Sequence, residues 1–230
     1  MYDLFEVRKV LIIAPLRVAR DTWSAEVQKW DHLKHLRYSV VVGTAEERTA
    51  ALNADADIYI INRENVDWLV SNTTFDYDML VIDELSSFKN HQSKRFKALM
   101  KVRPKVKRIV GLTGTPASNG LMDLFAEFRL LDMGERLGRF IGQYRNEYFK
   151  PDKQKGYVVY SYKPLPDAEE RIYDKISDIT VSMKAVDHLK MPELVSTESI
   201  VKMSDAEKEK YKELKDELIL EVQDTESLCS

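Results

Sequence analysis

The stretch MLVIDELS, residues 79–86, is a short apolar run that ends in two adjacent carboxylates, Asp83 and Glu84. Runs of this kind are typical of strands buried on both faces of a parallel sheet, and ligands of α/β folds bind at the carboxyl edge of such sheets. One carboxylate at that edge can hold the Mg²⁺ that bridges nucleotide phosphates, and its neighbour can orient or deprotonate an attacking water. An ordinary turn or helix start is the other interpretation, and for the pair taken alone it is the more frequent one.

A second strand with a polar end follows about one helix later. The run RIVGL, residues 108–112, leads into Thr113-Gly114-Thr115-Pro116, which offers two hydroxyl groups, a glycine and a proline that stops the strand. Taken alone, this is an ordinary strand-to-helix turn. An acidic pair after one strand and a Thr-Gly-Thr-Pro turn after the next are together far more specific than either feature, and they favour a functional site.

The rest of the first half alternates apolar strands with amphipathic helices. Three more short runs rich in β-branched residues lie at Val10–Ala14, Ser39–Val42 and Ile58–Ile61. Helical stripes lie between the strands, at Trp23, Val27 and Trp30 and again at Phe96, Leu99 and Met100. This alternation predicts a doubly wound α/β fold, in which helices cover both faces of a parallel sheet.

Beyond residue 111 the pattern becomes mainly helical. The spacing predicts a helix over Leu121–Leu131, capped by Ser118-Asn119, and a second helix over Leu137–Tyr148. Residues 150–168 are expected to form a loop or hairpin with one short aromatic strand at Tyr157–Tyr162.

A charged helix is predicted near the carboxyl terminus. Ser204 and Glu207 have the spacing of a capping box, which marks the start of a helix. The apolar face of this helix is expected to carry Tyr211, Leu214, Leu218 and Val222.

Composition excludes several classes of protein. Of the 230 residues, 44% are hydrophobic and 32% charged, so the chain can bury a real core and is neither disordered nor fibrous. No apolar run approaches the ~20 residues of a spanning helix, and the first residues carry no secretory signal, so we expect a cytoplasmic protein without a membrane partner. The single cysteine, Cys229, excludes an intrachain disulfide and a cysteine-based metal cage.

The net charge of −3 gives no hint of nucleic acid, but the distribution of charge is uneven. Between residues 89 and 108 there is no acidic residue and there are nine basic ones: Lys89, Lys94, Arg95, Lys97, Lys101, Arg103, Lys105, Lys107 and Arg108. This run could contact phosphate, or it could be a solvated basic surface.

Other candidate sites are weaker. The four histidines, among them His32 and His35, are too scattered to form a metal-ligand set. Trp23 and Trp30 could stack on bases, although their spacing favours the core of a helix. Ser86-Ser87 is interpreted as a cap for the helix after the carboxylates rather than as a nucleophile.

Several segments resemble the motifs of Swi/Snf-type ATPases of helicase superfamily two. VIDELSSFKN resembles motif II, and GLTGTPASNGLMDLFAEFRLL is very similar to motif III with its following helix. LIIAPLRVARDTWSAEVQKW (11–30) resembles motif Ia, and YIINREN (59–65) stands where motif Ib falls. The resemblance covers nearly the whole chain and is strongest to phage-encoded members, which implies a RecA-like sheet and a bacterial or phage-infected cell.

The resemblance implies a role for each matching residue. Asp83 would be the Mg²⁺-side carboxylate and Glu84 the catalytic, water-activating one, while Thr113, Gly114 and Thr115 would couple the ATP site to DNA contact. The residues expected along the DNA are Pro15, Arg17, Asn62, Arg63 and Lys89. Members of the family hydrolyse ATP when they are bound to duplex DNA and move along its backbone without sequence specificity, usually without separating the strands.

Two parts of the family pattern are absent from these residues. None of the eight glycines is followed by lysine, so the sequence holds no phosphate-binding G-x-x-x-x-G-K-[ST] loop, and no late motif resembles the second motor lobe with its arginine fingers. We therefore expect a partial first lobe over 1–133, truncated at its first strand–helix unit, a helical extension and bridge over 134–203, and a final helix with a frayed end over 204–230.

This truncation predicts a free sheet edge. The edge would be covered by the missing N-terminal segment, by the second lobe, by another copy of the chain or by a protein partner. The segment alone is expected to be inactive in ATP hydrolysis. The alternative hypothesis is a catalytically silent DNA- or protein-binding module that retains the fold.

Overall fold

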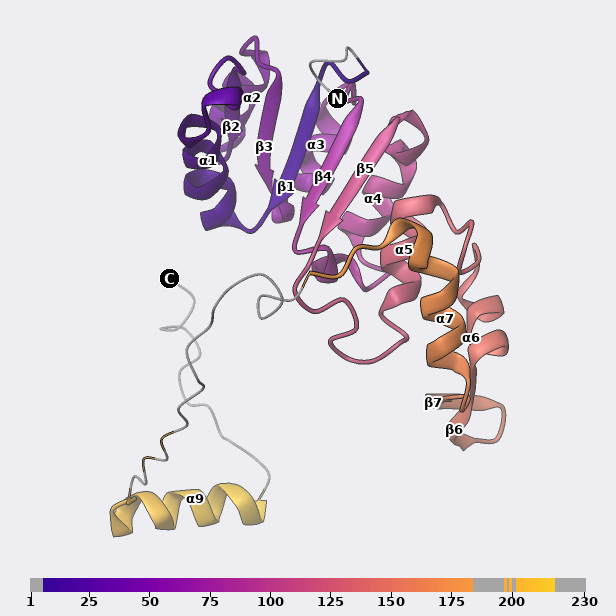
Figure 1. Ribbon diagram of the computed structural model, residues 1–230. Helices are drawn as coiled ribbons and strands as arrows, with labels where there is room; N and C mark the ends of the chain where they lie inside the picture. The colour runs from indigo at the N-terminus through magenta and orange to yellow at the C-terminus, as the bar shows by residue number, and fades with distance from the viewer. Residues whose placement is uncertain (1–5, 184–196, 198, 200–201, 218–230) are drawn as a thin grey trace. The chain divides into compact units, whose positions relative to one another are not determined.

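The computed structural model describes residues 6–183, 197, 199 and 202–217. The strands of its main sheet are β1 (Val10–Ala14), β2 (Tyr38–Val41), β3 (Ile58–Asn62), β4 (Met79–Asp83) and β5 (Arg108–Leu112). All neighbouring strands are parallel, in the order β2-β3-β1-β4-β5 (Figure 1). Each of the predicted strands is present within one residue at either end, so the predicted parallel α/β sheet is confirmed.

The helices are short, and the first four of them connect these strands. Their bounds are α1 (Trp23–Lys29), α2 (Ala45–Asn53), α3 (Val66–Asn72), α4 (Lys94–Val102), α5 (Leu124–Asp132), α6 (Ile141–Tyr148), α7 (Ala168–Ile176) and α9 (Asp205–Glu217). Side chains fix several starts: Thr44 and Glu47 form a capping box before α2, and Ser93 accepts from the backbone N–H of Phe96 before α4.

Helices cover both faces of the sheet, as predicted. Alternate residues of a strand face opposite sides, and in β1 the side chains of Leu11 and Ile13 join the core beneath α3 and α4. Ile12 and Ala14 join the other core, beneath α1. Because β1 is buried on both faces, its sequence is an uninterrupted apolar run.

Strand β5 is an edge of the sheet. It pairs with β4, and no other described strand pairs with it. Val110 and Leu112 lie on its α1-side face and remain 38% and 41% exposed, whereas Ile109 packs on the opposite core. The predicted unpaired edge with an apolar surface is therefore present among the described residues, and what covers it stays a prediction.

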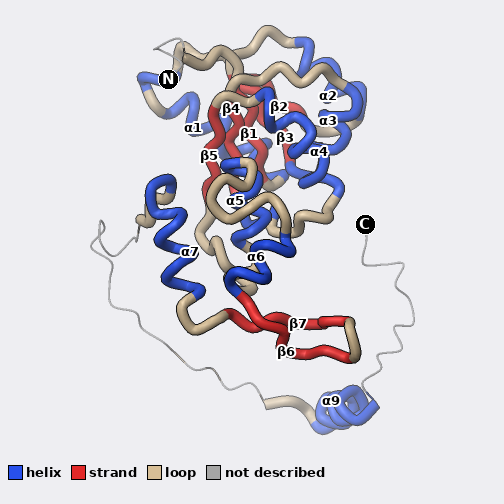
Figure 2. The backbone as a smooth tube through the Cα atoms, turned by 90° about the vertical axis from the view of Figure 1, so that its right-hand side faces the viewer, coloured by secondary structure: helices blue, strands red, loops and turns tan. Residues whose placement is uncertain are grey.

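Helix α5 is shared by two apolar cores. Its residues Ala126 and Leu130 pack into the core beneath the sheet, whereas Leu124, Phe125 and Phe128 pack with α6 and α7 (Figure 2). The second core is rich in aromatic rings because α6 contributes two buried tyrosines to it. The helical part of the chain is thus joined to the sheet through α5.

Helix α5 begins later than the sequence predicts. Ser118 and Asn119, the predicted cap, lie in a turn before the helix, and both donate to the Oδ2 atom of Asp123, at 3.3 Å and 3.0 Å. The prediction of the cap was wrong because the Asp123 carboxylate takes these two donors and holds the preceding turn, so that the helix starts at Leu124.

Two antiparallel strands follow α6, where the sequence predicts only one. They are β6 (Phe149–Lys155) and β7 (Val158–Pro164), which form a hairpin of their own. Strand β6 was missed because its sequence, FKPDKQK, is polar nearly throughout and lacks the apolar alternation of a half-buried strand.

The chain separates into two compact units, Met1–Val181 and Ser182–Ser230. In the second unit the predicted capping box is confirmed: Glu207 Oε2 accepts from the Ser204 N–H at 2.8 Å, and Ser204 Oγ accepts from the Glu207 N–H at 3.4 Å. Leu218, Val222 and Cys229 lie outside the described residues, and the predicted division at 133 and 203 stays a prediction. No helix of the described ranges is long and apolar enough to cross a membrane.

Candidate active site

Asp83 is the last residue of β4, at the carboxyl edge of the sheet. Its Oδ2 atom accepts a hydrogen bond from the indole N–H of Trp23, at 2.9 Å, and Trp23 is the first residue of α1. The other oxygen, Oδ1, accepts no hydrogen bond from the described residues. The tryptophan therefore holds the carboxylate in one orientation and leaves one oxygen available to a ligand.

Glu84 has a left-handed backbone, with φ of 61° and ψ of 64°. This conformation is uncommon for any residue with a Cβ and costs on the order of 1–2 kcal/mol, and such strain clusters at functional sites. It turns the chain out of β4 directly after Asp83. The strain is thus located at the residue for which the sequence predicts a catalytic role.

The side chain of Glu84 is fixed by two hydroxyl groups. Thr113 Oγ1 donates to Glu84 Oε1 at 2.9 Å, and Ser86 Oγ donates to the same oxygen. Thr113 follows β5, so this contact joins the ends of β4 and β5. Both bonds use Oε1, which leaves Oε2 without a hydrogen-bond partner among the described residues.

The Thr-Gly-Thr turn is ordered by its own first hydroxyl. The backbone N–H of Thr115 donates to Thr113 Oγ1 at 3.2 Å. Gly114 has no positive φ, and an added Cβ would meet nothing within 4 Å, so the fold itself does not require glycine there. Gly111 is different, because a Cβ at that position would lie 2.6 Å from Leu85 Cδ2 and 3.2 Å from Leu131 Cδ2.

Lys89 lies at the same edge but is engaged by protein groups. Its Nζ donates to Ser118 Oγ at 2.9 Å and lies 3.6 Å from Asp123 Oδ2. This ion pair links the turn after β4 to the start of α5. Lys89 is therefore a link within the site, and its predicted DNA contact requires that the pair open.

The basic run between residues 89 and 108 does not form one phosphate-binding surface. Arg103 is buried, and its guanidinium donates to the carbonyl oxygens of Leu130 at 2.8 Å and Leu131 at 2.5 Å, at the carboxyl end of α5. Lys107 pairs with Asp78 at 2.7 Å. These cations stabilise the fold, while others of the run face solvent.

A buried acid lies beneath the site. Glu127, in α5, is fully buried, and neither carboxylate oxygen has a hydrogen-bond partner in the part of the chain that the structure describes. Burial is the largest of the causes that raise its pKa to about 8; the carboxylates of Asp123 and Glu84 also raise the pKa, and Lys89 lowers it. Sequence reasoning missed Glu127, although an acid inside the apolar stripe of a helix was a visible signal.

Four of the residues predicted to follow DNA lie at the carboxyl ends of β1 and β3, at the same edge: Pro15 and Arg17 follow β1, Asn62 ends β3, and Arg63 comes next. Arg17 is exposed, and the Arg63 Nε atom donates to Glu64 Oε1 at 2.8 Å. Asn62 is buried: its amide donates to Glu64 Oε2 at 3.0 Å, and its carbonyl oxygen accepts from Asn65 at 2.6 Å. Asn62 therefore orders the loop, while Arg17, Arg63 and the half-buried Pro15 are better placed to meet a ligand.

Three weaker predictions have clear outcomes. Trp30 is exposed, with its indole N–H donating to Glu26 at 2.7 Å, so its assignment to a helix core was wrong. The partly buried Trp23 packs against the core beneath α1, as predicted, and its indole N–H also donates to Asp83. Ser86 and Ser87 lie within a 3₁₀ turn, Leu85–Phe88, so neither caps a helix, because α4 starts later with its own cap.

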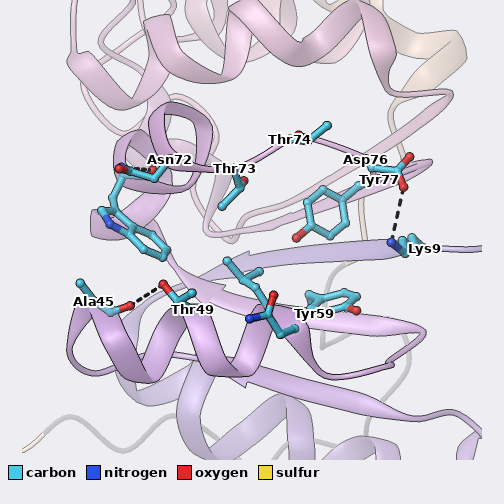
Figure 3. A pocket seen from close by; sticks show the side chains of 12 residues that line it. Lys9, Ala45, Thr49, Tyr59, Asn72, Thr73, Thr74, Asp76 and Tyr77 are labelled. Carbon is cyan, nitrogen blue, oxygen red and sulfur yellow. Dashed lines mark hydrogen bonds and ion pairs between the residues drawn. The ribbon is translucent and has the colours of Figure 1, made fainter.

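A hollow of about 580 Å³ lies away from these residues (Figure 3). Its lining includes Thr49 of α2, Trp68 of α3, and Tyr59 and Tyr77. It extends to the Lys9–Asp76 ion pair of 3.4 Å, and these two residues precede β1 and β4. The hollow therefore reaches toward the amino edge of the sheet and is separate from Asp83 and Glu84.

The donor set fits Mg²⁺ and not a complete nucleotide site. Asp83, Glu84 and Thr113 offer only hard oxygen ligands, which Mg²⁺ prefers, and it is commonly held by one or two carboxylates together with phosphates. Within the described ranges, no three His, Cys, Asp or Glu side chains could hold a metal ion on their own. A phosphate-binding glycine–lysine loop is absent from the 230 residues.

Comparison with known proteins gives a consistent result. Residues 3–228 match the SNF2-related domain. A phage protein, p41 of Acyrthosiphon pisum secondary endosymbiont phage 1, is 35% identical over 94% of this chain and 49% of its own length. An uncharacterized ATP-dependent helicase of Mycoplasma genitalium is 24% identical over 94% of this chain and 20% of its own length. The chain thus spans half or less of these relatives.

Solved structures agree with the fold. The SWI2/SNF2 ATPase core of Sulfolobus solfataricus in complex with dsDNA superposes with a TM-score of 0.55 and 28% identity, covering 64% of this chain and 29% of that one. The same core domain solved separately gives a TM-score of 0.54 at 24% identity, over 94% of this chain and 42% of that one. With the match over residues 3–228, these findings establish that the chain belongs to the SNF2-related family of helicase-like ATPase domains.

Proposed function

We propose that this chain is the first-lobe part of a motor that uses ATP to move along or remodel duplex DNA. The observation that carries the proposal is the left-handed, hydroxyl-bonded Glu84 beside the tryptophan-bonded Asp83. A binding module without catalysis has no chemical reason to keep a strained carboxylate at a ligand edge.

Each carboxylate has a distinct task in this proposal. Asp83 would hold Mg²⁺ through Oδ1, because Oδ2 is already committed to Trp23. Glu84 would accept a hydrogen bond from the attacking water through Oε2, since Oε1 is held by Thr113. When bound, Mg²⁺ and ATP would supply the electrophilic phosphorus and the charge that stabilises its transfer.

Thr113 would connect this chemistry to DNA. It contacts Glu84 through its hydroxyl and orders the turn to Thr115 through the same atom. A shift of this turn when DNA binds would change the hydrogen bond to Glu84 and hence its orientation. Arg17 and Arg63 would contact the DNA phosphates at the same edge. Such contacts position the protein on the DNA but do not recognise a base sequence.

The phosphate cradle must come from elsewhere in the assembly. These residues contain no glycine–lysine loop, and the curated relatives are at least twice the length that this chain covers. We therefore expect the 230 residues alone to hydrolyse ATP at background rates. A segment that carries the cradle, together with a second lobe, would complete the motor in the cytoplasm of a bacterial or phage-infected cell.

The decisive experiment measures DNA-stimulated ATP hydrolysis by the complete gene product isolated from its source. Glu84→Gln keeps the size of the side chain and should lower turnover by at least about 10²-fold, since it removes the water-activating group. Glu209→Gln, at an exposed position of α9, is the matched control and should have no effect. Binding of duplex DNA without any ATP turnover in the wild-type protein would replace the proposal with a silent binding module.

A further inference from the structure

The β6–β7 hairpin extends away from the sheet, beyond α6 and α7 (Figures 1 and 2). Its strands pair from Phe149↔Pro164 to Lys155↔Val158, with a register shift on either side of Lys153. Of its residues only Phe149 is buried, so nearly all of the ribbon faces solvent. A two-stranded ribbon has little core of its own and is marginally stable in water, and only its base packs on the aromatic core, through Phe149 and Tyr162.

The turn of this hairpin presents an aromatic ring at the tip. Gly156 and Tyr157 are the two residues between Lys155 and Val158, and Gly156 has φ of 60°. A positive φ at the first position of a two-residue hairpin turn is the place for glycine. Tyr157 is 105% exposed, and its ring therefore touches almost nothing in the protein.

A second exposed ring lies on β7. Tyr160 is 68% exposed and shares a face of the strand with Val158 and Tyr162, since alternate residues point the same way. Tyr162 is only partly buried and lies under the guanidinium of Arg145, with 4.7 Å from its centroid to Cζ. The ribbon thus has an aromatic face that is anchored at its base and open toward its tip.

Positive charge accompanies these rings. The ribbon carries four lysines and one acid: Lys150, Lys153, Lys155, Lys163 and Asp152. All four lysines are exposed and none forms an ion pair within the described residues. Asp152 accepts from Ser161 Oγ at 2.8 Å. A ligand that matches this surface carries several negative charges, which would pair with the lysines, and flat aromatic groups, which would stack on the tyrosine rings.

Single-stranded DNA has that chemistry. Exposed aromatic side chains stack on bases whose faces are free, while lysines neutralise the adjacent phosphates. In a duplex the base faces are already stacked on one another, so only unpaired bases offer a free face to Tyr157 and Tyr160. An acidic protein would match the lysines but would have no comparable need for the two rings.

We infer that the β6–β7 hairpin binds an unpaired DNA strand, through stacking on Tyr157 and Tyr160 and phosphate contacts from its lysines. This inference rests on the proposed function in so far as DNA is the ligand of the motor. It refines that function, because the preferred substrate becomes a duplex with an adjoining single-stranded segment.

Fluorescence anisotropy with the full 230-residue chain tests the inference. The probes are a blunt duplex, the same duplex with a single-stranded tail, and the tail alone. Tyr157→Ala with Tyr160→Ala should weaken binding of the tailed duplex and the tail by at least about fivefold for each ring lost, and leave the blunt duplex within twofold. Tyr173→Ala with Tyr211→Ala removes two exposed rings elsewhere and should change nothing.

Two further variants separate stacking from charge. Tyr157→Phe with Tyr160→Phe retains the rings and should keep wild-type affinity. Lys153→Gln with Lys155→Gln should lower the magnitude of the log–log salt slope for the tail by about 1.4, which corresponds to two phosphate contacts. The exposed pair Lys208→Gln with Lys210→Gln is the control for net charge.

The outcomes distinguish this inference from the proposed function. Wild-type affinity of the double alanine variant for all three probes overturns the inference and leaves the motor proposal intact. Hairpin-dependent binding of the tail without any binding of duplex supports the inference and argues against duplex DNA as the track. Binding of none of the probes by the wild-type chain contradicts both.

Discussion

Trp23 and Asp83 are sixty positions apart in the sequence, yet the indole N–H of the first donates to the carboxylate of the second at 2.9 Å. This bond joins the start of α1 to the end of β4. Because it fixes one carboxylate oxygen, it determines which oxygen is free for a metal ion. The candidate Mg²⁺ ligand is therefore oriented by a residue of a different motif.

Replacement of the indole N–H should impair activity more than stability. In Trp23→Phe an aromatic ring remains but the donor is lost, so we expect DNA-stimulated ATP turnover of the complete protein to fall about tenfold. The free energy of unfolding should fall by about 1 kcal/mol, the value of one hydrogen bond. Trp30→Phe, which removes an exposed indole bonded to Glu26, should leave turnover unchanged in the same assay. Equal loss in both variants would contradict a positioning role for Trp23.

The strained backbone of Glu84 predicts a difference in stability between two variants that both lose its carboxylate and its hydroxyl contacts. Glycine adopts the left-handed region freely, so the free energy of unfolding of Glu84→Gly should be about 1 kcal/mol higher than that of Glu84→Ala, measured by urea denaturation. Glu84→Ala removes the same carboxylate but keeps the strain and is the matched control. If alanine and glycine gave the same stability, the backbone conformation would carry no strain.

Glu127 predicts an unusual dependence of stability on pH. Its pKa is about 8 in the folded chain and near 4.5 when unfolded, so between these values the folded state binds the additional proton. Its contribution is therefore fully present below about pH 4.5 and is lost as pH rises through 8, by on the order of 1.36 kcal/mol for each unit of separation. We expect Glu127→Gln to remove this decline in urea denaturation series at several pH values. Parallel curves for the two proteins would contradict the raised pKa.

Two glycines near the site should respond differently to alanine. A Cβ on Gly111 would meet the buried side chain of Leu85, so Gly111→Ala should lower the free energy of unfolding by roughly 1–3 kcal/mol. Gly114 has open space around it, so Gly114→Ala should leave stability unchanged. Thermal unfolding of both variants checks this, and a destabilised Gly114→Ala would show that the turn packs more closely than described. Loss of ATP turnover in stable Gly114→Ala would locate its role in catalysis.

The sheet could be predicted from the sequence because its physical cause is local. Strands such as β1 and β3 are buried on both faces, so all or nearly all of their residues are apolar. A short uninterrupted apolar run of this kind is typical of a strand in a parallel sheet. The edge location of Asp83 and Glu84 followed from the same argument, since the polar residues stand directly after an apolar strand.

The details that were missed depend on residues distant in sequence or on competition between neighbours. Nothing near Trp23 indicates that its partner is Asp83. Ser118 and Asn119 do not cap α5 because the Ser118 hydroxyl and the Asn119 N–H donate to the Asp123 carboxylate. The polar segment β6 forms a strand because it pairs with β7, which its own sequence does not indicate. Glu127 lies in a helix whose apolar residues recur at helical spacing. That spacing predicts a buried helix face but does not indicate that an acid is buried with it.

The sharing of α5 between two cores has a mechanical consequence. One side of the helix packs in the core beneath the sheet, and the other packs in the aromatic core with α6 and α7. Arg103 donates hydrogen bonds to carbonyl groups at the carboxyl end of α5. Asp123, just before α5, is tied through Lys89 to the turn after β4. A force applied to α6 and α7 would therefore be transmitted through α5 to the residues beside Glu84, because α5 is packed on both sides and cannot bend like a hinge.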